Sequence, residues 1–457
     1  MRTTKTENKM GTMPINRLLL NLSIPMMLSM MVQGLYNVVD SIFVSRICED
    51  AFTAVSLAFP IQTLIIALGV GTGIGVNALL SKTLGEKNFS KVNVIAMNAI
   101  FIAFIHIAIF LVIGAFFVQP FYIKQTSDAV IIAYGVQYLR IICLGATGIF
   151  MQLTMERLLQ ATGNTIYAMI SQMAGAFTNL ILDPVLIFGL FGAPKMGVAG
   201  AAIATITGQG VAAALAFLFN IQKNTEIHFD FHRFYPSLSV LKEIYVVAIP
   251  SIIMQSISSV MTFGMNQILI TFSSTATAVF GMYYKVQSFV FMPVFGLTHG
   301  VAPIVAYNYG AQKRKRMLET IRLSLSYAMV IMIVGMIVLL SIPDKICMLF
   351  DASPEMMRMG IPALRIISVH FPLAAVGIIL GIVFQALGNS WYSMIISIGR
   401  QVVILLPVAY LLSLTGELNF VWFCFPIAEF IALLLNIFFY IRINRKVISK
   451  VGEASNA

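Results

Sequence analysis

Charged residues are scarce in this chain of 457 residues. They make up 10% of it, whereas a soluble protein of this length carries about 25%, because its folded surface faces water. Hydrophobic residues make up 59% of the chain, and its mean hydropathy is +0.91. This shortage of charge excludes an ordinary soluble enzyme and a disordered chain, and it favours a protein whose surface lies largely in a lipid bilayer.

Several sequence signatures of chemistry are also absent. The four cysteines show no CxxC spacing, no GxxxxGK[ST] run occurs, and the five histidines form neither an HExxH motif nor a triad-like spacing. These absences argue against a metal cluster, an ATP-hydrolysing engine and a membrane-embedded hydrolase. We therefore expect neither an enzyme nor a bound cofactor.

Apolar segments long enough to cross a bilayer recur along the whole chain. A helix needs about 20 apolar residues to span the hydrocarbon. We expect twelve such spans, near 18–45, 52–81, 92–118, 130–156, 166–190, 197–221, 243–271, 276–308, 320–342, 359–386, 391–414 and 420–441. The sequence therefore predicts an all-α integral membrane protein.

The distribution of basic residues sets the expected orientation. The net charge of +11 is compatible with nucleic-acid binding, but Lys and Arg also collect in the cytoplasmic loops of membrane proteins. With a cytoplasmic N-terminus, twenty basic residues fall in inside segments and five in outside loops. We therefore predict a multi-pass protein of the bacterial plasma membrane with both termini cytoplasmic, and no nucleic-acid partner.

The two halves of the chain resemble each other at an offset of 225 residues. LRII occurs at 139–142 and again at 364–367, QATGN at 160–164 matches QALGN at 385–389, and Pro25 matches Pro250. Each half holds six spans, so both begin on the same side, and parallel repeats of this kind are typical of secondary transporters. We expect an N-terminal six-helix lobe at 1–222, a cytoplasmic linker at 223–241 and a C-terminal six-helix lobe at 242–457.

These motifs carry a family resemblance. The IPM start of the first span, NVVD at its end, the PxxGxxxGxxPxxAYNYGA pattern at 293–311 and the repeated QAxGN resemble the multidrug and toxic compound extrusion (MATE) family over nearly the whole chain. Asp40 and NLILDP at 179–184 are similar to its bacterial Mep-type and DNA-damage-inducible branch. The resemblance implies a V-shaped pair of six-helix lobes and cation-coupled efflux of organic cations.

Carboxylates inside the spans are few and one-sided. They are Asp40, Glu156, Asp183 and Glu429, and a charge in hydrocarbon is costly unless it faces a cavity or a partner. By helical rise, Asp40 lies about 9 Å and Asp183 about 11 Å below the outer surface, and Asn179 is one turn from Asp183. This cluster predicts a coupling site for H⁺ or Na⁺. The alternatives are that Asp183 caps a helix beginning at Pro184 and that Asp40 pairs with Arg46.

Other residues are expected to contact the substrate. We predict that Glu156 meets cationic substrates near the inner end of the fourth span, unless it only pairs with its neighbour Arg157. Tyr36 and Asn37 are the other predicted substrate-binding residues. Glu429, Lys285 and Arg400 are expected to form a buried charge network in the second half.

The sequence therefore predicts a monomeric secondary antiporter in which H⁺ or Na⁺ drives export of amphipathic organic cations by alternating access. One alternative is a flippase for lipid-linked oligosaccharides from the same superfamily, for which Lys285 and Arg400 would supply positive charge. A membrane-embedded enzyme or a channel is the alternative from a different class.

Overall fold

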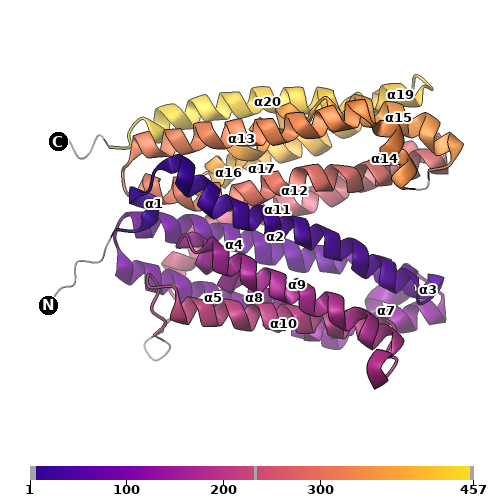
Figure 1. Cartoon of the computed structure of the whole chain (residues 1–457), viewed down its shortest axis with the longest axis horizontal. Helices are drawn as coiled ribbons and strands as arrows, with labels where there is room; N and C mark the ends of the chain where they lie inside the picture. The colour runs from indigo at the N-terminus through magenta and orange to yellow at the C-terminus, as the bar shows by residue number, and fades with distance from the viewer. Residues whose placement is uncertain (1–6, 231–233, 351, 453–457) are drawn as a thin grey trace. The chain divides into compact units, whose positions relative to one another are not determined.

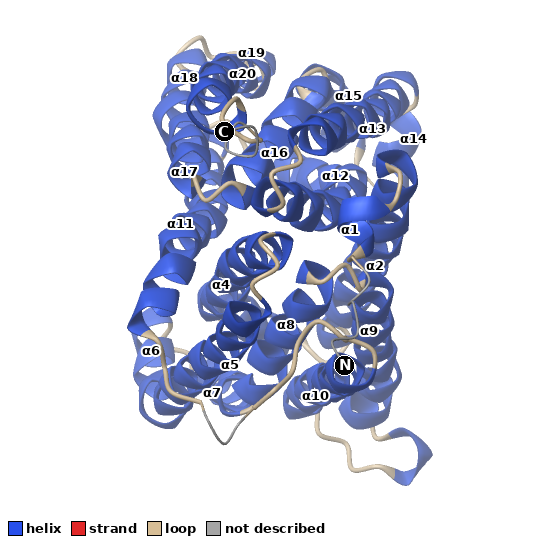
Figure 2. Cartoon of the chain, turned by 90° about the vertical axis from the view of Figure 1, so that its left-hand side faces the viewer, coloured by secondary structure: helices blue, strands red, loops and turns tan. Residues whose placement is uncertain are grey.

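The structure is a computed structural model that describes residues 7–230, 234–350 and 352–452, with the side chain of Asn37 left out. In these ranges the regular secondary structure is helical throughout, without strands (Figure 2). The predicted all-α fold is therefore confirmed.

The helices of the first half are α1 (Lys9–Thr12), α2 (Ile15–Ser45), α3 (Glu49–Leu57), α4 (Phe59–Gly85), α5 (Phe89–Val112), the π-helix η1 (Ile113–Phe117), α6 (Val118–Gln125), α7 (Ala129–Leu144), α8 (Ala146–Ala161), α9 (Thr165–Phe188), the 3₁₀ turn η2 (Leu190–Gly192) and α10 (Val198–Gln222) (Figure 1).

The helices of the second half are α11 (Leu238–Leu269), α12 (Ser274–Gly310), α13 (Arg314–Ser341), α14 (Pro343–Leu349), α15 (Pro354–Ser368), α16 (Phe371–Ala386), α17 (Ser390–Ile398), the π-helix η3 (Gly399–Leu405), α18 (Leu406–Ser413), α19 (Leu418–Val421), α20 (Cys424–Ile443) and the π-helix η4 (Asn444–Ile448).

The membrane spans follow from helix length and hydropathy. Of the described helices, 10 are long and apolar enough to cross a bilayer, and two bent pairs also qualify, α7 with α8 (44° apart) and α15 with α16 (50° apart). Counting each bent pair as one span gives the twelve spans that the sequence predicts. The two bends lie at equivalent places in the two repeats, because α8 and α16 begin 225 residues apart.

The repeat also explains the QAxGN motifs. Gly163 and Gly388 have φ angles of +84° and +77°, a left-handed conformation that glycine adopts without a steric cost. Each glycine ends the turn that separates α8 from α9 and α16 from α17. The motif is therefore a tight turn between consecutive spans, placed identically in both halves.

The contacts divide the chain into two compact units whose borders lie inside helices. One unit is Leu28–Ala248, and the other joins Met1–Met27 to Ile249–Ala457. The borders fall within α2 and α11, close to the prolines Pro25 and Pro250 inside those helices. The first part of α2 thus packs with the second half of the chain, and the start of α11 packs with the first half. The lobe borders expected at 222 and 242 do not take into account that the first part of α2 and the start of α11 each pack with the other half.

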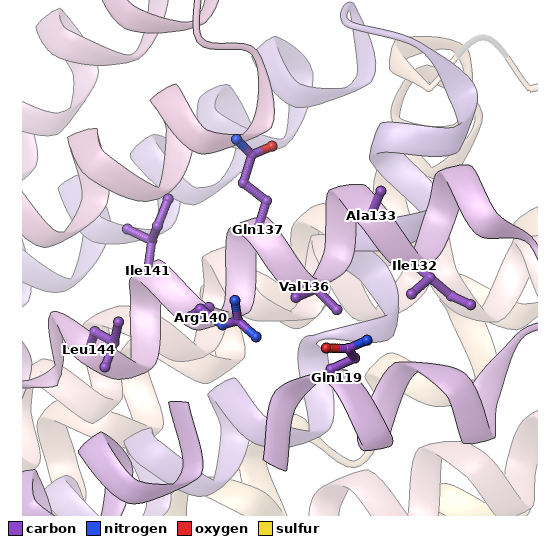
Figure 3. A pocket seen from close by; sticks show the side chains of 8 residues that line it. All are labelled: Gln119, Ile132, Ala133, Val136, Gln137, Arg140, Ile141 and Leu144. Carbon is purple, nitrogen blue, oxygen red and sulfur yellow. The ribbon is translucent and has the colours of Figure 1, made fainter. Parts of the chain in front are cut away.

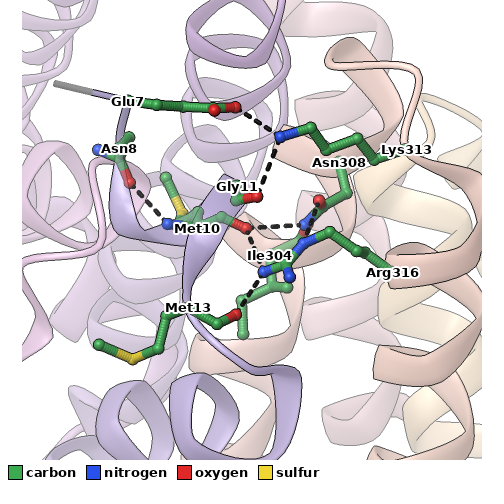
Figure 4. A network of polar contacts seen from close by, with 9 residues as sticks. All are labelled: Glu7, Asn8, Met10, Gly11, Met13, Ile304, Asn308, Lys313 and Arg316. Atoms are coloured by element: carbon green, nitrogen blue, oxygen red, sulfur yellow. Dashed lines mark hydrogen bonds and ion pairs between the residues drawn. The ribbon is translucent and has the colours of Figure 1, made fainter. Parts of the chain in front are cut away.

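In the unit that contains the C-terminal half, α1 is fixed by an N-terminal clamp, defined here as Lys313, Arg316 and Asn308 together with the segment that they hold (Figure 4). Lys313 forms an ion pair with Glu7 and donates to the carbonyl oxygen of Gly11 at 3.0 Å. Arg316 donates to the carbonyl oxygens of Met10 and Met13 at 3.1 and 2.6 Å. The clamp satisfies backbone carbonyls that the one-turn helix α1 cannot pair by itself.

The other unit holds the start of α11 by similar means. Lys91, at the position equivalent to Arg316, forms an ion pair with Glu243 at 2.8 Å. The side-chain oxygens of Asn93 and Asn98 accept hydrogen bonds from the backbone N–H groups of His228 and Ser237, at 2.8 and 3.0 Å. In both repeats, therefore, polar side chains of equivalent helices, α5 and α13, hold the segment at the start of the first span, which is α11 or α2.

Candidate functional site

The predicted coupling residues come together inside the unit Leu28–Ala248. Asp40 lies on α2, and Asn179 and Asp183 lie one turn apart on α9. Asp183 is completely buried, and the carboxyl groups of Asp40 and Asp183 are within hydrogen-bonding range of each other. Two carboxylates in such contact repel one another unless a proton or a cation lies between them.

Asn179 is tied to Asp183 and to the neighbouring helix α10. Its amide fits its surroundings when the nitrogen donates to Asp183 Oδ2 at 3.1 Å and the oxygen accepts from the backbone N–H of Thr205 at 3.2 Å. The side chain is 3% exposed. Asn179 therefore holds the Asp183 carboxyl in place from one side, while Asp40 approaches it from α2.

Close packing of α9 against α10 positions this pair. A Cβ atom on Gly208 would lie 2.6 Å from the carbonyl oxygen of Gly175 and 3.1 Å from Cβ of Asn179. A Cβ atom on Gly175 would lie 2.7 Å from the carbonyl oxygen of Gly208. Glycine at both positions lets the two backbones approach, as small residues do between membrane helices. The glycine seam, meaning Gly175 and Gly208, thus sets the distance between α9 and α10 beside the site.

The helix-cap alternative for Asp183 does not hold. Pro184 lies inside α9, which continues to Phe188, so Asp183 occupies an interior position and not a helix start. The ring of Pro184 removes one backbone N–H and crowds the carbonyl four residues earlier. Asp183 is therefore a buried interior carboxyl group beside a weakened turn.

Two tyrosines complete the surroundings of the carboxyl pair. Tyr36 and Tyr138 lie near both Asp40 and Asp183, and the Tyr138 hydroxyl accepts a hydrogen bond of 2.8 Å from Gln62 Nε2. One carboxyl oxygen, Oδ1 of Asp40, is buried and has no hydrogen-bond partner among the described residues. An orphaned oxygen beside a second carboxyl group is an acceptor ready for a proton or a small cation.

Sequence reasoning nominated Tyr36 but missed Tyr138, Gln62 and Thr205. A signal for Tyr138 was available, because the equivalent position in the second repeat is Ala363. That asymmetry matches the one that singled out the carboxylates. Gln62 recurs as Gln287, so repeat comparison gives no reason to select it.

Glu156 lies apart from this cluster, on α8. It is 3% exposed, and its carboxylate accepts a hydrogen bond of 3.0 Å from Gln152 Nε2. The neighbouring Arg157 is 7% exposed and donates to Gln160 Oε1 at 2.9 Å. The structure thus places Glu156 in the interior of its unit, in a row of polar side chains along α8. Asn37, the remaining predicted substrate contact, has its side chain outside the described residues.

Within its described residues, the second half carries an ion pair with a buried carboxylate. Arg400 of η3 donates to Glu429 Oε2 of α20 at 2.8 Å, and the Glu429 side chain is 7% exposed. Lys285 of α12 is exposed. Of the expected charge network, Arg400 and Glu429 are therefore paired directly.

A metal cluster is not present in the described ranges, where no three His, Cys, Asp or Glu side chains lie close enough to hold an ion together. The oxygens of Asp40 and Asp183 are hard ligands suited to Na⁺, whereas the amide oxygen of Asn179 is occupied by the N–H of Thr205. A cation at this site would therefore be held mainly by the carboxylate oxygens of Asp40 and Asp183.

Comparison with known proteins gives the same picture of the fold. The MatE family model matches residues 25–185 and 250–411, one stretch in each repeat. The chain is 27% identical over 441 residues to the multidrug export protein MepA of Staphylococcus haemolyticus, covering 96% of each chain. It is also 27% identical over 420 residues to an FAD transporter of Shewanella oneidensis, covering 91% of this chain and 92% of that one.

Solved structures agree over almost the full length. An outward-facing multidrug resistance MATE family transporter of the MOP superfamily superposes with a TM-score of 0.91 at 25% identity, over 98% of this chain and 100% of that chain. A MOP superfamily transporter of Pyrococcus furiosus, described by the reverse polarity of its binding pocket, gives a TM-score of 0.88 at 25% identity, over 99% and 100%. With its twelve spans, its two matched repeats and these relatives, the chain belongs to the MatE family, whose members are membrane transporters and not enzymes, as the sequence predicts.

Proposed function

We propose that this transporter is an antiporter that exports small organic cations from the bacterial cytoplasm in exchange for H⁺ or Na⁺ bound at Asp40 and Asp183. The observation that carries the proposal is the contact between these two carboxyl groups, one of them completely buried. A proton or cation that enters the pair removes their repulsion and so favours one packing of α2 against α9. An ion drives transport only when it binds one conformation better than the other.

The geometry favours a proton over Na⁺. The carboxyl groups lie within hydrogen-bonding range of each other, and the Asn179 oxygen already accepts a hydrogen bond from Thr205 of α10. Na⁺ needs several oxygen ligands around it, and the Asn179 oxygen would have to leave the N–H of Thr205 to become one of them. A proton shared between the carboxyl groups needs nothing else.

Glu156, Tyr36 and Asn37 are the proposed substrate contacts. Both termini are proposed to face the cytoplasm, and the transporter is proposed to work as a monomer. Two relatives support the export of drug-like compounds by similarity, the MepA protein and the multidrug resistance MATE transporter. A second candidate substrate is an anionic compound, since the FAD transporter is as similar as the MepA protein. The flippase alternative has less support, because Arg400 is neutralised by Glu429.

The test is transport by the purified protein in sealed vesicles. A pH gradient without Na⁺ and a Na⁺ gradient at equal pH are imposed separately, with a fluorescent organic cation or FAD as the transported compound. We expect the pH gradient to drive the organic cation and Asp183→Asn to stop it. Export of the cation with neither gradient, or by the variant at the full rate, would contradict the proposal. Export of FAD alone would support the second candidate.

A further inference from the structure

A groove of about 450 Å³ lies between α6 and α7 in the unit Leu28–Ala248, and neither residue of the carboxyl pair lines it (Figure 3). Its walls are apolar, and its polar lining residues are Gln119, Gln137 and Arg140. Figure 3 shows Arg140 and Gln119 reaching into the gap between the two helices, whereas Gln137 points to the other side of α7. The groove thus combines one cation and one amide with hydrocarbon-like walls.

Arg140 needs a partner that the described residues do not supply. It is exposed, and no hydrogen bond or ion pair to another described residue is formed by its guanidinium. A guanidinium stays charged under all conditions and presents five N–H donors. At the edge of a bilayer such a group requires water, a carboxylate or a phosphate.

Arg140 lies in the outer part of the span predicted at 130–156, ten residues from the start of that span. It precedes Ala161, the last residue of α8, by 21 positions, which corresponds to at most about 31 Å along the bent span. The hydrocarbon core is about 30 Å thick. Next to the groove, the exposed side chains Phe116 (71%), Phe117 (59%) and Leu144 (45%) indicate that this face contacts lipid. The side chain of an arginine inside a span extends toward the nearer interface, so we expect the guanidinium to point to the headgroup phosphates of the leaflet opposite the α8 end.

We propose that this groove binds an anionic phospholipid such as phosphatidylglycerol. The guanidinium of Arg140 would hold the phosphate by paired N–H···O bonds, a geometry in which Arg is the preferred residue. Gln119 adds amide donors for the headgroup, and the apolar walls formed by Ile132, Val136 and Leu144 accept the start of an acyl chain.

The second repeat supplies a matched control. Arg365 occupies the position equivalent to Arg140 and is also exposed, but Asp344 replaces Gln119 and Pro362 replaces Gln137. A carboxylate in place of the Gln119 amide repels a phosphate and offers no donor, so we expect the same lipid to bind more weakly there. The lipid site is thus expected in the first repeat alone, although both repeats contain the arginine.

Native mass spectrometry of the full-length protein, with phosphatidylglycerol or phosphatidylcholine added at equal amounts, tests the proposal. We expect wild type to retain phosphatidylglycerol in preference to phosphatidylcholine. Arg140→Gln should weaken phosphatidylglycerol binding about tenfold, as the loss of one charge-assisted contact implies, whereas Arg365→Gln should not. Arg140→Lys keeps the charge and should lose only part of the affinity, and Gln119→Leu should give a smaller loss of about threefold.

Three results would overturn the site. Undiminished phosphatidylglycerol binding by Arg140→Gln would show that the lipid binds elsewhere. Equal losses in the Arg140 and Arg365 variants would indicate attraction to total charge only. Displacement of the lipid by millimolar inorganic phosphate would identify a phosphate site without a lipid preference. Melting temperatures in neutral detergent verify that every variant is folded. If Arg140→Gln does not fold, the partial loss of affinity expected for Arg140→Lys tests the site instead.

Discussion

The two repeats solve the same packing problem differently at the pair of helices that follows the bend. In the first repeat, α9 and α10 approach through the glycine seam. In the second, the equivalent positions are Arg400 and Leu433, and the backbone of this span widens into the π-helix η3 (Gly399–Leu405). There the Arg400–Glu429 ion pair, at 2.8 Å, joins η3 to α20.

This difference distinguishes the helices that both repeats share from the carboxyl pair that the first repeat carries. Several equivalent helices of the two repeats start 225 residues apart, for example α7 and α15 at Ala129 and Pro354. Among the described residues, only those of the first repeat place carboxyl groups in mutual contact beside a close helix pair. In the second repeat, Val408 stands at the position of Asp183 and Ile404 at that of Asn179. A duplicated fold can thus assign ion coupling to one copy and leave the other to hold its spans together.

The largest effect should come from Asp183→Asn. Removing this carboxyl group abolishes the repulsion that an incoming ion relieves, so gradient-driven export should fall at least about a hundredfold, as is typical when an essential carboxylate is lost. The amount of protein in the membrane should change little. Glu429→Gln is the comparison in the second repeat, and after normalisation to protein amount it should keep most of its coupled transport. Equal losses of coupling in both variants would end the assignment of coupling to the first repeat alone.

Breaking the ion pair of the second repeat should reduce the stability of the protein more than its transport activity. Glu429→Gln leaves a partly buried Arg400 without its counter-charge, and we expect a loss of about 2–3 kcal/mol in unfolding free energy. The double variant with Arg400→Gln should regain part of this loss, because no unpaired charge remains. Thermal unfolding in detergent measures both. A double variant that is no more stable than the single one would show that the pair is not an isolated unit.

Gly208→Ala tests the glycine seam. The added methyl group would lie 2.6 Å from the Gly175 carbonyl oxygen, so α10 must move away from α9, at a cost of about 1–3 kcal/mol. Because Asn179 is next to the seam, coupled transport should fall severalfold as well. Gly210→Ala on the same helix is the matched control, since nothing lies within 4 Å of its Cβ position. Equal losses of stability and transport in the two variants would show that the glycine seam does not position Asn179.

The smallest effect is expected for Glu156→Gln. If this buried carboxylate attracts cationic substrates, their export should fall by a few-fold while neutral compounds are exported at the normal rate, because a neutral molecule gains nothing from the charge. Export rates of one cationic and one neutral compound, each divided by protein amount, measure the difference. A uniform loss that disappears on this normalisation would leave Glu156 as the hydrogen-bonded neighbour of Gln152.

Much of this architecture could be predicted from sequence because it depends on local signals. Hydropathy defines the spans, and QAxGN predicts a turn in each repeat because glycine permits the positive φ. Asp40 and Asp183 could be nominated because a carboxylate inside an apolar run is conspicuous. Tyr138 carried a weaker signal, namely Ala363 at the equivalent position of the second repeat, and the burial of Glu156 depends on how α8 packs. The unit border at Met27 depends on contacts between residues some three hundred positions apart, which no local pattern encodes.

The N-terminal clamp has a consequence for how the protein is made. Met10 precedes its partner Arg316 by 306 positions, and synthesis proceeds at about 5–20 residues per second. The first turns of the chain therefore wait on the order of 15 to 60 seconds before the side chains that fix them leave the ribosome. The linker before α11 has no such delay, because Asn93 and Asn98, which accept hydrogen bonds from His228 and Ser237, have already been synthesised. The earliest part of the protein to be translated is thus among the last to reach its final contacts.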